Sequence, residues 1–141
     1  MNSVKMFVVG AALVLVPALV KAADEPRKLD FTQSIRLVDG SPMTECTKLS
    51  ERKSPNDPQT CESFREVTLG AVAYASLIKS DQGLAMTEQG NRWRLARKVY
   101  DASSIELSKP DVTTIMTAIS KLGASLEITG QAYCMLDQTF C

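Results

Sequence analysis

Four cysteines are the residues of this chain best suited to covalent chemistry: Cys46, Cys61, Cys134 and Cys141. The gaps between them hold 14, 72 and 6 residues, so the close C-x-x-C pairs of structural metal sites are absent. We therefore predict two disulfide bonds, no metal site and no cofactor. Four cysteines allow three pairings.

Geometry limits one of these pairings. In a continuous helix Cys134 and Cys141 would lie about 10 Å apart along the axis, which is too far for a disulfide bond. If these two residues pair, the last helix must end before Phe140.

Histidine is absent from the chain. This excludes Ser-His and Cys-His nucleophile arrangements and every zinc site that uses histidine. Carboxylates are scattered, and the pairs Asp101 with Glu106 or Glu127 with Asp137 could converge in space. No catalytic residue is predicted, and a small carboxylate-dependent hydrolase is kept only as a second alternative function.

A basic cluster at residues 92–98 is the one stretch that resembles a binding motif. At helical spacing we expect Trp93 to face the core and the outer side to carry Arg94, Arg97 and Lys98, which form the candidate binding surface. Cations around a tryptophan could also hold phosphates and stack on a base. Because a solvated outer face explains the same pattern, nucleic acid is not the expected partner.

The first 22 residues read as a signal peptide. One cation precedes an apolar run from Met6 to Val20, and Val20-Lys21-Ala22 has small residues at the cleavage positions. The rival interpretation is a retained anchor, but the run is shorter than the roughly 20 residues of a spanning helix. We expect a periplasmic or secreted protein with no stable membrane span after cleavage.

The exported part is predicted to comprise a mobile lead-in over residues 23–28 and one disulfide-stapled domain over residues 29–141. Removing Lys5 and Lys21 leaves 14 basic against 16 acidic residues, a formal charge of −2. The overall balance therefore exerts no strong pull on nucleic acid or anionic lipid.

The predicted fold class is α+β and mainly α, with a short N-terminal β-hairpin followed by three to four packed helices. Residues 29–38 and 43–49 read as the two strands around the turn Asp39-Gly40-Ser41-Pro42, and residues 50–63 as a surface loop. Helices are expected over 69–79, 87–102, from Ser108 to a stop at Gly123, and over 129–137.

Several short signatures resemble small proteins of unassigned function encoded in tailed-phage and prophage genomes. They are Asp30-Phe31-Thr32, Asp39-Gly40-Ser41-Pro42, Thr68-Leu69-Gly70-Ala71-Val72-Ala73, Arg92-Trp93-Arg94-Leu95-Ala96, Ile105-Glu106-Leu107-Ser108 and Gly130-Gln131-Ala132-Tyr133. The resemblance implies a phage-linked origin and a hairpin-plus-helices fold, and it implies no activity.

The expected function is that of an exported, non-enzymatic binding protein whose partner is a protein of the periplasm or envelope, as a phage-derived inhibitor or exclusion factor would be. The alternative is a structural component of a virion or envelope assembly. This expectation rests on the predicted export signal, the two predicted disulfides, and the absence of histidine and of a catalytic pattern.

Overall fold

A computed structural model describes residues 25–79 and 83–141, so the predicted signal peptide lies outside the described residues. The fold is α+β and mainly α, with two disulfides. The elements in chain order are β1 Arg27–Leu29, β2 Thr44–Leu49, β3 Cys61–Glu66, α1 Leu69–Ile78, α2 Met86–Val99, β4 Ile105–Leu107, α3 Lys109–Ser120, α4 Leu126–Leu136 and the 3₁₀ turn η1 Gln138–Phe140.

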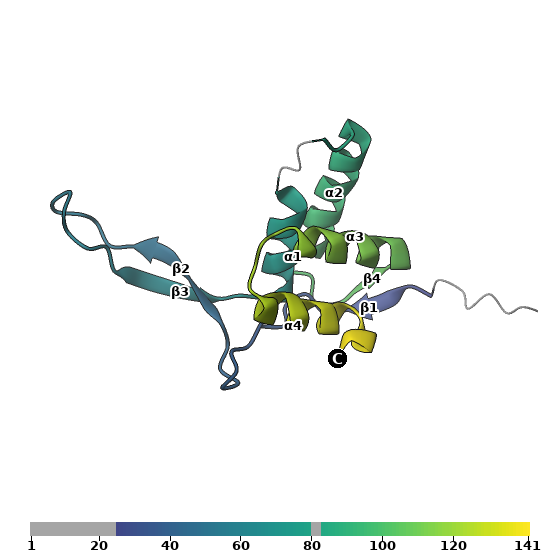
Figure 1. Ribbon diagram of the computed structural model, residues 1–141, viewed down its shortest axis with the longest axis horizontal. Helices are drawn as coiled ribbons and strands as arrows, with labels where there is room; N and C mark the ends of the chain where they lie inside the picture. The colour runs from purple at the N-terminus through teal and green to yellow at the C-terminus, as the bar shows by residue number, and fades with distance from the viewer. Residues whose placement is uncertain (1–24, 80–82) are drawn as a thin grey trace, which may run out of the picture.

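The helices pack into a body in which α1 contacts α2, α3 and α4 (Figure 1). Every helix contributes to its core, and so do Phe31, Ile35 and Leu107 from outside the helices. The largest fully buried side chains are Phe31, Ile35, Leu69, Leu107, Ile115, Ile119, Leu136 and Val99.

Gly70 sits where α1 meets the chain around Phe31. A Cβ atom at this position would lie 2.9 Å from the Phe31 carbonyl oxygen and 3.2 Å from that of Val99. The Gly70 amide donates to the same Phe31 carbonyl at 2.8 Å. Only glycine lets the three backbones approach this closely.

Two predicted helix starts are confirmed. The Thr68 hydroxyl accepts from the Ala71 amide at 3.1 Å at the start of α1, and the Ser108 hydroxyl accepts from the Asp111 amide at 3.3 Å at the start of α3. Gly123 has a φ of +78°, the left-handed backbone expected just after a helix end.

The last helix begins earlier than predicted. Residues 126–128 were expected to form an apolar link, but they are the first turn of α4. The reason is Ser125, whose hydroxyl accepts from the Ile128 amide at 3.4 Å and so caps the helix at this point.

The lead-in is also shorter than predicted. Arg27 and Lys28 were expected to be mobile, but they belong to β1, which pairs antiparallel with β4. The register joins Arg27 to Leu107 and Leu29 to Ile105. This pairing depends on partners far apart in the chain, which local patterns do not reveal.

The predicted hairpin partners were wrong. Leu29 ends β1 and residues 30–38 do not continue the strand, because the Asp30 carboxylate accepts from the Thr32 amide at 2.9 Å and turns the chain. The turn after Leu37 exists, but only a single bridge, Arg36 to Pro42, flanks it. Instead β2 pairs antiparallel with β3, part of which was assigned to a loop.

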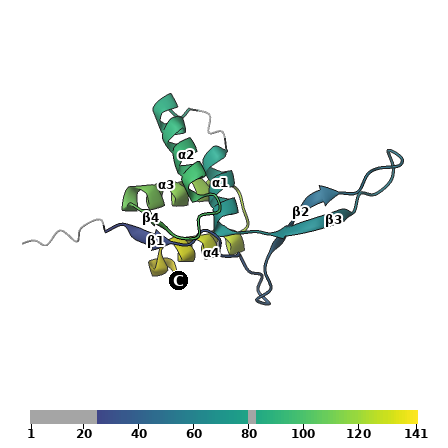
Figure 2. The ribbon, with the colours of Figure 1, turned by 180° about the vertical axis from the view of Figure 1, so that it is seen from behind.

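The β2–β3 hairpin with its connecting loop, residues 44–66, is called the arm below. It extends well away from the helical body, as two opposite views show (Figures 1 and 2). At its base three backbone hydrogen bonds link Ile35, Met43 and Val67, at 2.7 to 2.8 Å. Since Ile35 is fully buried, this junction attaches the arm to the core.

Candidate functional site

The three predicted binding cations lie on one side of α2. Arg94 and Lys98, one helical turn apart, line an open hollow of about 410 Å³ between α2 and α3 together with Asp111. Arg97 lies one turn beyond Trp93 and three residues from Arg94, so the three cations span an arc of about 100° around the helix. The structure thus keeps the predicted residues on one side of α2, with Arg97 outside the hollow.

All three cations are exposed. Lys98 Nζ donates to the Glu106 carbonyl oxygen at 3.3 Å, and the Arg94 guanidinium donates to Asn91 Oδ1. Among the described residues no carboxylate lies within ion-pair distance of any of the three. This side of α2 therefore presents positive charge that the body does not neutralise.

The prediction that Trp93 faces the core was wrong. Trp93 is 51% exposed, whereas its neighbour Arg92 is 5% exposed. The buried face of α2 consists of Arg92, Leu95, Ala96 and Val99, so its centre is rotated by about 30° from the predicted orientation.

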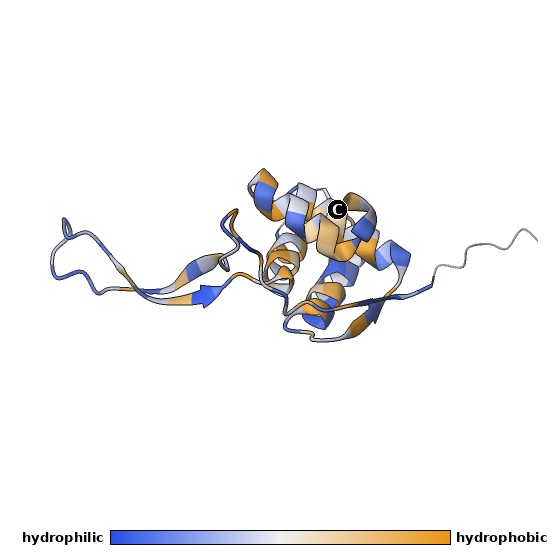
Figure 3. Cartoon of the chain, turned by 90° about the horizontal axis from the view of Figure 1, so that it is seen from below, coloured by the Kyte–Doolittle hydropathy of each residue, from blue (hydrophilic) through white to orange (hydrophobic). Residues whose placement is uncertain are grey.

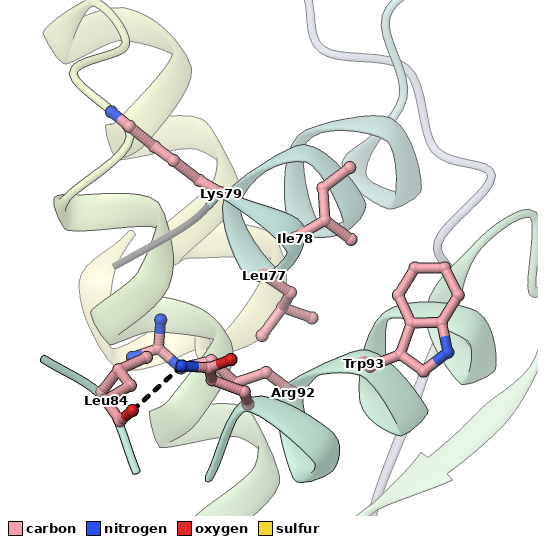
Figure 4. Close-up of a pocket in the computed structure, with 7 residues that line it drawn as sticks. Leu77, Ile78, Lys79, Leu84, Arg92 and Trp93 are labelled. Carbon is pink, nitrogen blue, oxygen red and sulfur yellow. Dashed lines mark hydrogen bonds between the residues drawn. The ribbon is translucent and has the colours of Figure 1, made fainter. Parts of the chain in front are cut away.

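Arg92 can occupy an interior position because its long aliphatic stem packs while its guanidinium reaches Glu88, 3.6 Å away. A hollow of about 230 Å³ lies between the end of α1 and the first half of α2, lined by Leu77, Ile78, Arg92 and Trp93 among others. In Figure 4 the indole of Trp93 lies at one side of this hollow, away from the guanidinium of Arg92.

Both disulfides are present, and the cysteines pair in sequence order. Cys46 bonds to Cys61 with their Cα atoms 5.8 Å apart, and Cys134 bonds to Cys141 with their Cα atoms 4.8 Å apart. Helix α4 ends at Leu136, as the second pairing requires, and the η1 turn brings Cys141 back. No described cysteine is free.

The arm has two faces of different chemistry. In its register Cys46 lies opposite Phe64, and Leu49 lies opposite Cys61. Directly opposed residues share a face, and the Cys46–Cys61 bond joins the two pairs. Phe64, the disulfide and Leu49 therefore form one apolar stripe, in which Phe64 is 64% and Leu49 is 53% exposed.

The other face of the arm carries two ion pairs. Arg65 Nε lies 2.5 Å from Glu45 Oε1, and Lys48 Nζ lies 2.7 Å from Glu62 Oε2. Register shifts on either side of Lys48 interrupt strict residue alternation, but successive opposed pairs still alternate between the two faces. The pairs that contain Arg65 and Lys48 therefore lie opposite the apolar stripe. The arm is thus amphipathic, and Phe64 and Leu49 on its apolar face are exposed. Figure 3 shows hydrophobic and hydrophilic residues interspersed along it.

Arg65 also ties the arm to the body. Hydrogen bonding to the Glu45 carboxylate raises the pKa of Arg65, with a smaller contribution from the Tyr100 hydroxyl at the end of α2. Ser34, in the chain that leads to the arm, donates to the Glu66 carboxylate. These contacts orient the arm at its base and leave its outer part exposed.

The candidate carboxylate pair Glu127 and Asp137 is not brought together. The two residues lie at opposite ends of α4, so they are about 15 Å apart along the axis, beyond the spacing of paired catalytic carboxylates. Asp137 instead pairs with Arg27 at 2.9 Å. Hydrogen bonds from Arg27 and from the Thr139 amide lower the pKa of Asp137 to about 2.

The residues that sequence reasoning missed are Phe64 and Leu49. Leu49 ended a predicted strand, but Pro55 and Pro58 made residues 50–63 read as a loop, so no partner strand was expected next to it. The available signal was Cys61, since a cysteine that pairs with Cys46 brings the two segments side by side.

We found no family model, no curated protein and no solved structure that matches this chain. In residues 25–79 and 83–141 no helix has the length and apolar character needed to cross a membrane. The same residues contain no cluster of three or more His, Cys, Asp or Glu side chains that could hold a metal ion.

Proposed function

We propose that this protein is an exported, non-enzymatic binding protein that engages a protein of the periplasm or envelope through the arm. A phage-derived inhibitor or exclusion factor would act in this way. The observation that carries the proposal is the disulfide-closed arm, which holds Phe64 and Leu49 exposed on one face at a distance from the body.

The disulfide supports this role because an isolated two-stranded hairpin is marginally stable in water. Closing a loop of about 15 residues stabilises the arm by roughly 3 kcal/mol, because the bond restricts the conformations of the unfolded chain. An arm that is already ordered loses less conformational entropy on binding, which favours affinity. A large aromatic side chain at its centre is typical of interface hot spots.

One observation favours the alternative of a structural component. Among the described residues β2 and β3 form a two-stranded sheet, so both outer edges have unpaired backbone groups. Such edges can accept a strand from a second copy. A register shift between Cys46 and Lys48 interrupts the β2 edge, which weakens this alternative.

The test is affinity capture from a periplasmic and envelope extract with three immobilised proteins: the unsubstituted protein, Phe64→Ser and Val38→Ser. Val38 is 96% exposed in the turn outside the arm, so Val38→Ser is the matched control. We expect one envelope protein to be retained by the unsubstituted and control proteins and lost with Phe64→Ser. Equal retention of the envelope protein by all three would exclude the apolar face of the arm as the binding site. A ladder of cross-linked copies of this chain would support the structural role.

A further inference from the structure

Helix α2 and its C-terminal capping residue carry a row of exposed apolar side chains. Met86, Trp93 and Tyr100 are spaced by seven residues, which places them on one side of the helix. They are 87%, 51% and 44% exposed. This row is called the α2 stripe below.

Helix α1 widens the stripe. Ile78, which is 44% exposed, lines the same hollow as Trp93, and the Tyr74 ring lies 4.9 Å from the Tyr100 ring. The exposed surface along α2 therefore combines Trp93 and Tyr100 with Met86 and Ile78, and the partly buried Tyr74 supports it from below. Tryptophan and tyrosine are the residues that favour the boundary between water and lipid, because one end of each is apolar and the other is polar.

Positive charge flanks the stripe on one side. Arg97 is the cation nearest to Trp93 around the helix, followed by Arg94 and then Lys98. No carboxylate of the described residues forms an ion pair with these three cations. The long side chains of such residues can extend to phosphate groups while the apolar row enters the membrane interface.

The exposed area of the α2 stripe favours a lipid surface over a protein as its binding partner. Its three side chains expose on the order of 400 Å², which is below the roughly 800 Å² per partner of a stable protein interface. Attachment to a lipid surface needs no minimum buried area of this kind. Each cation near an anionic surface adds about 1 kcal/mol to the binding, so three cations and a small apolar row can act together.

We propose that the α2 stripe and its flanking cations Arg94, Arg97 and Lys98 form a docking site for the surface of a membrane that contains anionic phospholipid. The proposal goes beyond the binding role of the arm and rests on different residues. It concerns attachment to the surface only, with α2 lying in the headgroup region. The arm extends away from α2, so it would stay accessible in the attached protein (Figure 1).

The test uses the exported chain and two kinds of vesicle, phosphatidylcholine alone and an equimolar mixture with phosphatidylglycerol. Trp93 is the single tryptophan of the chain, so its fluorescence reports directly on the stripe. We expect co-sedimentation and a blue shift of the emission with the mixed vesicles, and neither with phosphatidylcholine alone. High salt should weaken the binding.

Two variants and their matched controls test the assignment. Met86→Gln should weaken binding roughly tenfold, from the lost burial of one apolar side chain, whereas Leu126→Gln, at an equally exposed position on α4, should not. Removing two charges with Arg94→Gln and Arg97→Gln should weaken binding about 30-fold. The same loss of charge through Arg52→Gln and Lys53→Gln, in the loop of the arm, should have little effect.

Three outcomes would overturn the proposal. The first is that the unsubstituted protein does not bind the mixed vesicles. The second is an equal loss of binding in variants and controls, which would indicate nonspecific adsorption. The third is a shift of the Trp93 emission caused only by a single-stranded oligonucleotide or by raising the protein concentration, which would assign the stripe to nucleic acid or to a second copy.

Discussion

The helical body and the arm reach a defined structure by different physical means. In the described part of the chain every buried apolar residue belongs to the body, and none lies between Thr44 and Glu66. The arm instead has the Cys46–Cys61 bond and the two ion pairs between β2 and β3. Burial of apolar area therefore stabilises the body, whereas the arm depends mainly on a covalent cross-link.

This difference separates stability from binding. A buried residue of the body contributes to stability through its contacts, so substituting it destabilises the protein. A residue of the arm has few contacts to lose, so its side chain is available to a partner at little thermodynamic penalty. The following predictions test this division, beginning with the largest expected effect.

Two phenylalanines make the most direct comparison. Phe31 is fully buried in the body and Phe64 is 64% exposed on the arm. We expect Phe31→Ala to lower the free energy of unfolding by about 3 to 5 kcal/mol, because it leaves a cavity in the core. Phe64→Ala should lower it by less than about 0.5 kcal/mol. Urea denaturation measures both, and similar values for the two would contradict the division.

The arm disulfide should act locally. Replacing both Cys46 and Cys61 with Ser removes about 3 kcal/mol of loop-closure stabilisation. We expect amide hydrogen exchange in the arm to become roughly 100-fold faster while exchange in the core of α1 and α3 stays nearly unchanged. If protection is lost across the helices as well, the arm is part of the cooperative unit of the body.

Trp93 and Leu95 compare an exposed and a buried side chain within one helix. Trp93→Ala should lower the free energy of unfolding by only about 1 to 2 kcal/mol, since half of the side chain is already in water. Leu95→Ala, at a position that is 7% exposed, should lower it by about 2 to 5 kcal/mol. Thermal and urea midpoints test this, and a larger effect at Trp93 would show that its indole packs into the body after all.

The smallest expected effect is a pH dependence at the end of the chain. The folded pKa of Asp137, about 2, lies below the ordinary value of 3.8, so the pairing with Arg27 stabilises the folded state above about pH 4 and is lost as pH falls toward 2. We expect the stability of the unsubstituted protein to fall over this range more steeply than that of Asp137→Asn. Parallel slopes would show that the Arg27–Asp137 pair contributes nothing to folding. Arg27→Gln, which removes the main cause of the shift, should resemble Asp137→Asn.

Local chemistry was predictable from the sequence. The starts of α1 and α3 were predicted, and at each the hydroxyl before the helix, of Thr68 or Ser108, accepts from an amide three residues on. The turn at Gly40 and the end of α3 at Gly123 depend likewise on the backbone freedom of glycine. The number and spacing of cysteines were sufficient to predict two disulfides.

The tertiary structure decided what depends on distant partners. Residues 44–49 carry the same strand pattern whichever segment pairs with them, and the Asp30 turn together with burial of Ile35 excluded the nearer candidate. The pairing of β1 with β4 joins residues that are almost eighty positions apart. The pairing of the four cysteines followed from the same arrangement.

The two candidate surfaces show the same limit. A helical pattern tells which residues share a face, but on α2 both the face with Trp93 and the face with Leu95 contain apolar side chains. Which of them turns inward depended on packing against α1, where the stem of Arg92 fits between the helices and the indole does not. The sequence therefore determined the local elements and their caps. Only tertiary packing decided which side chains remain exposed for binding, because burial is a property of the whole assembly of elements.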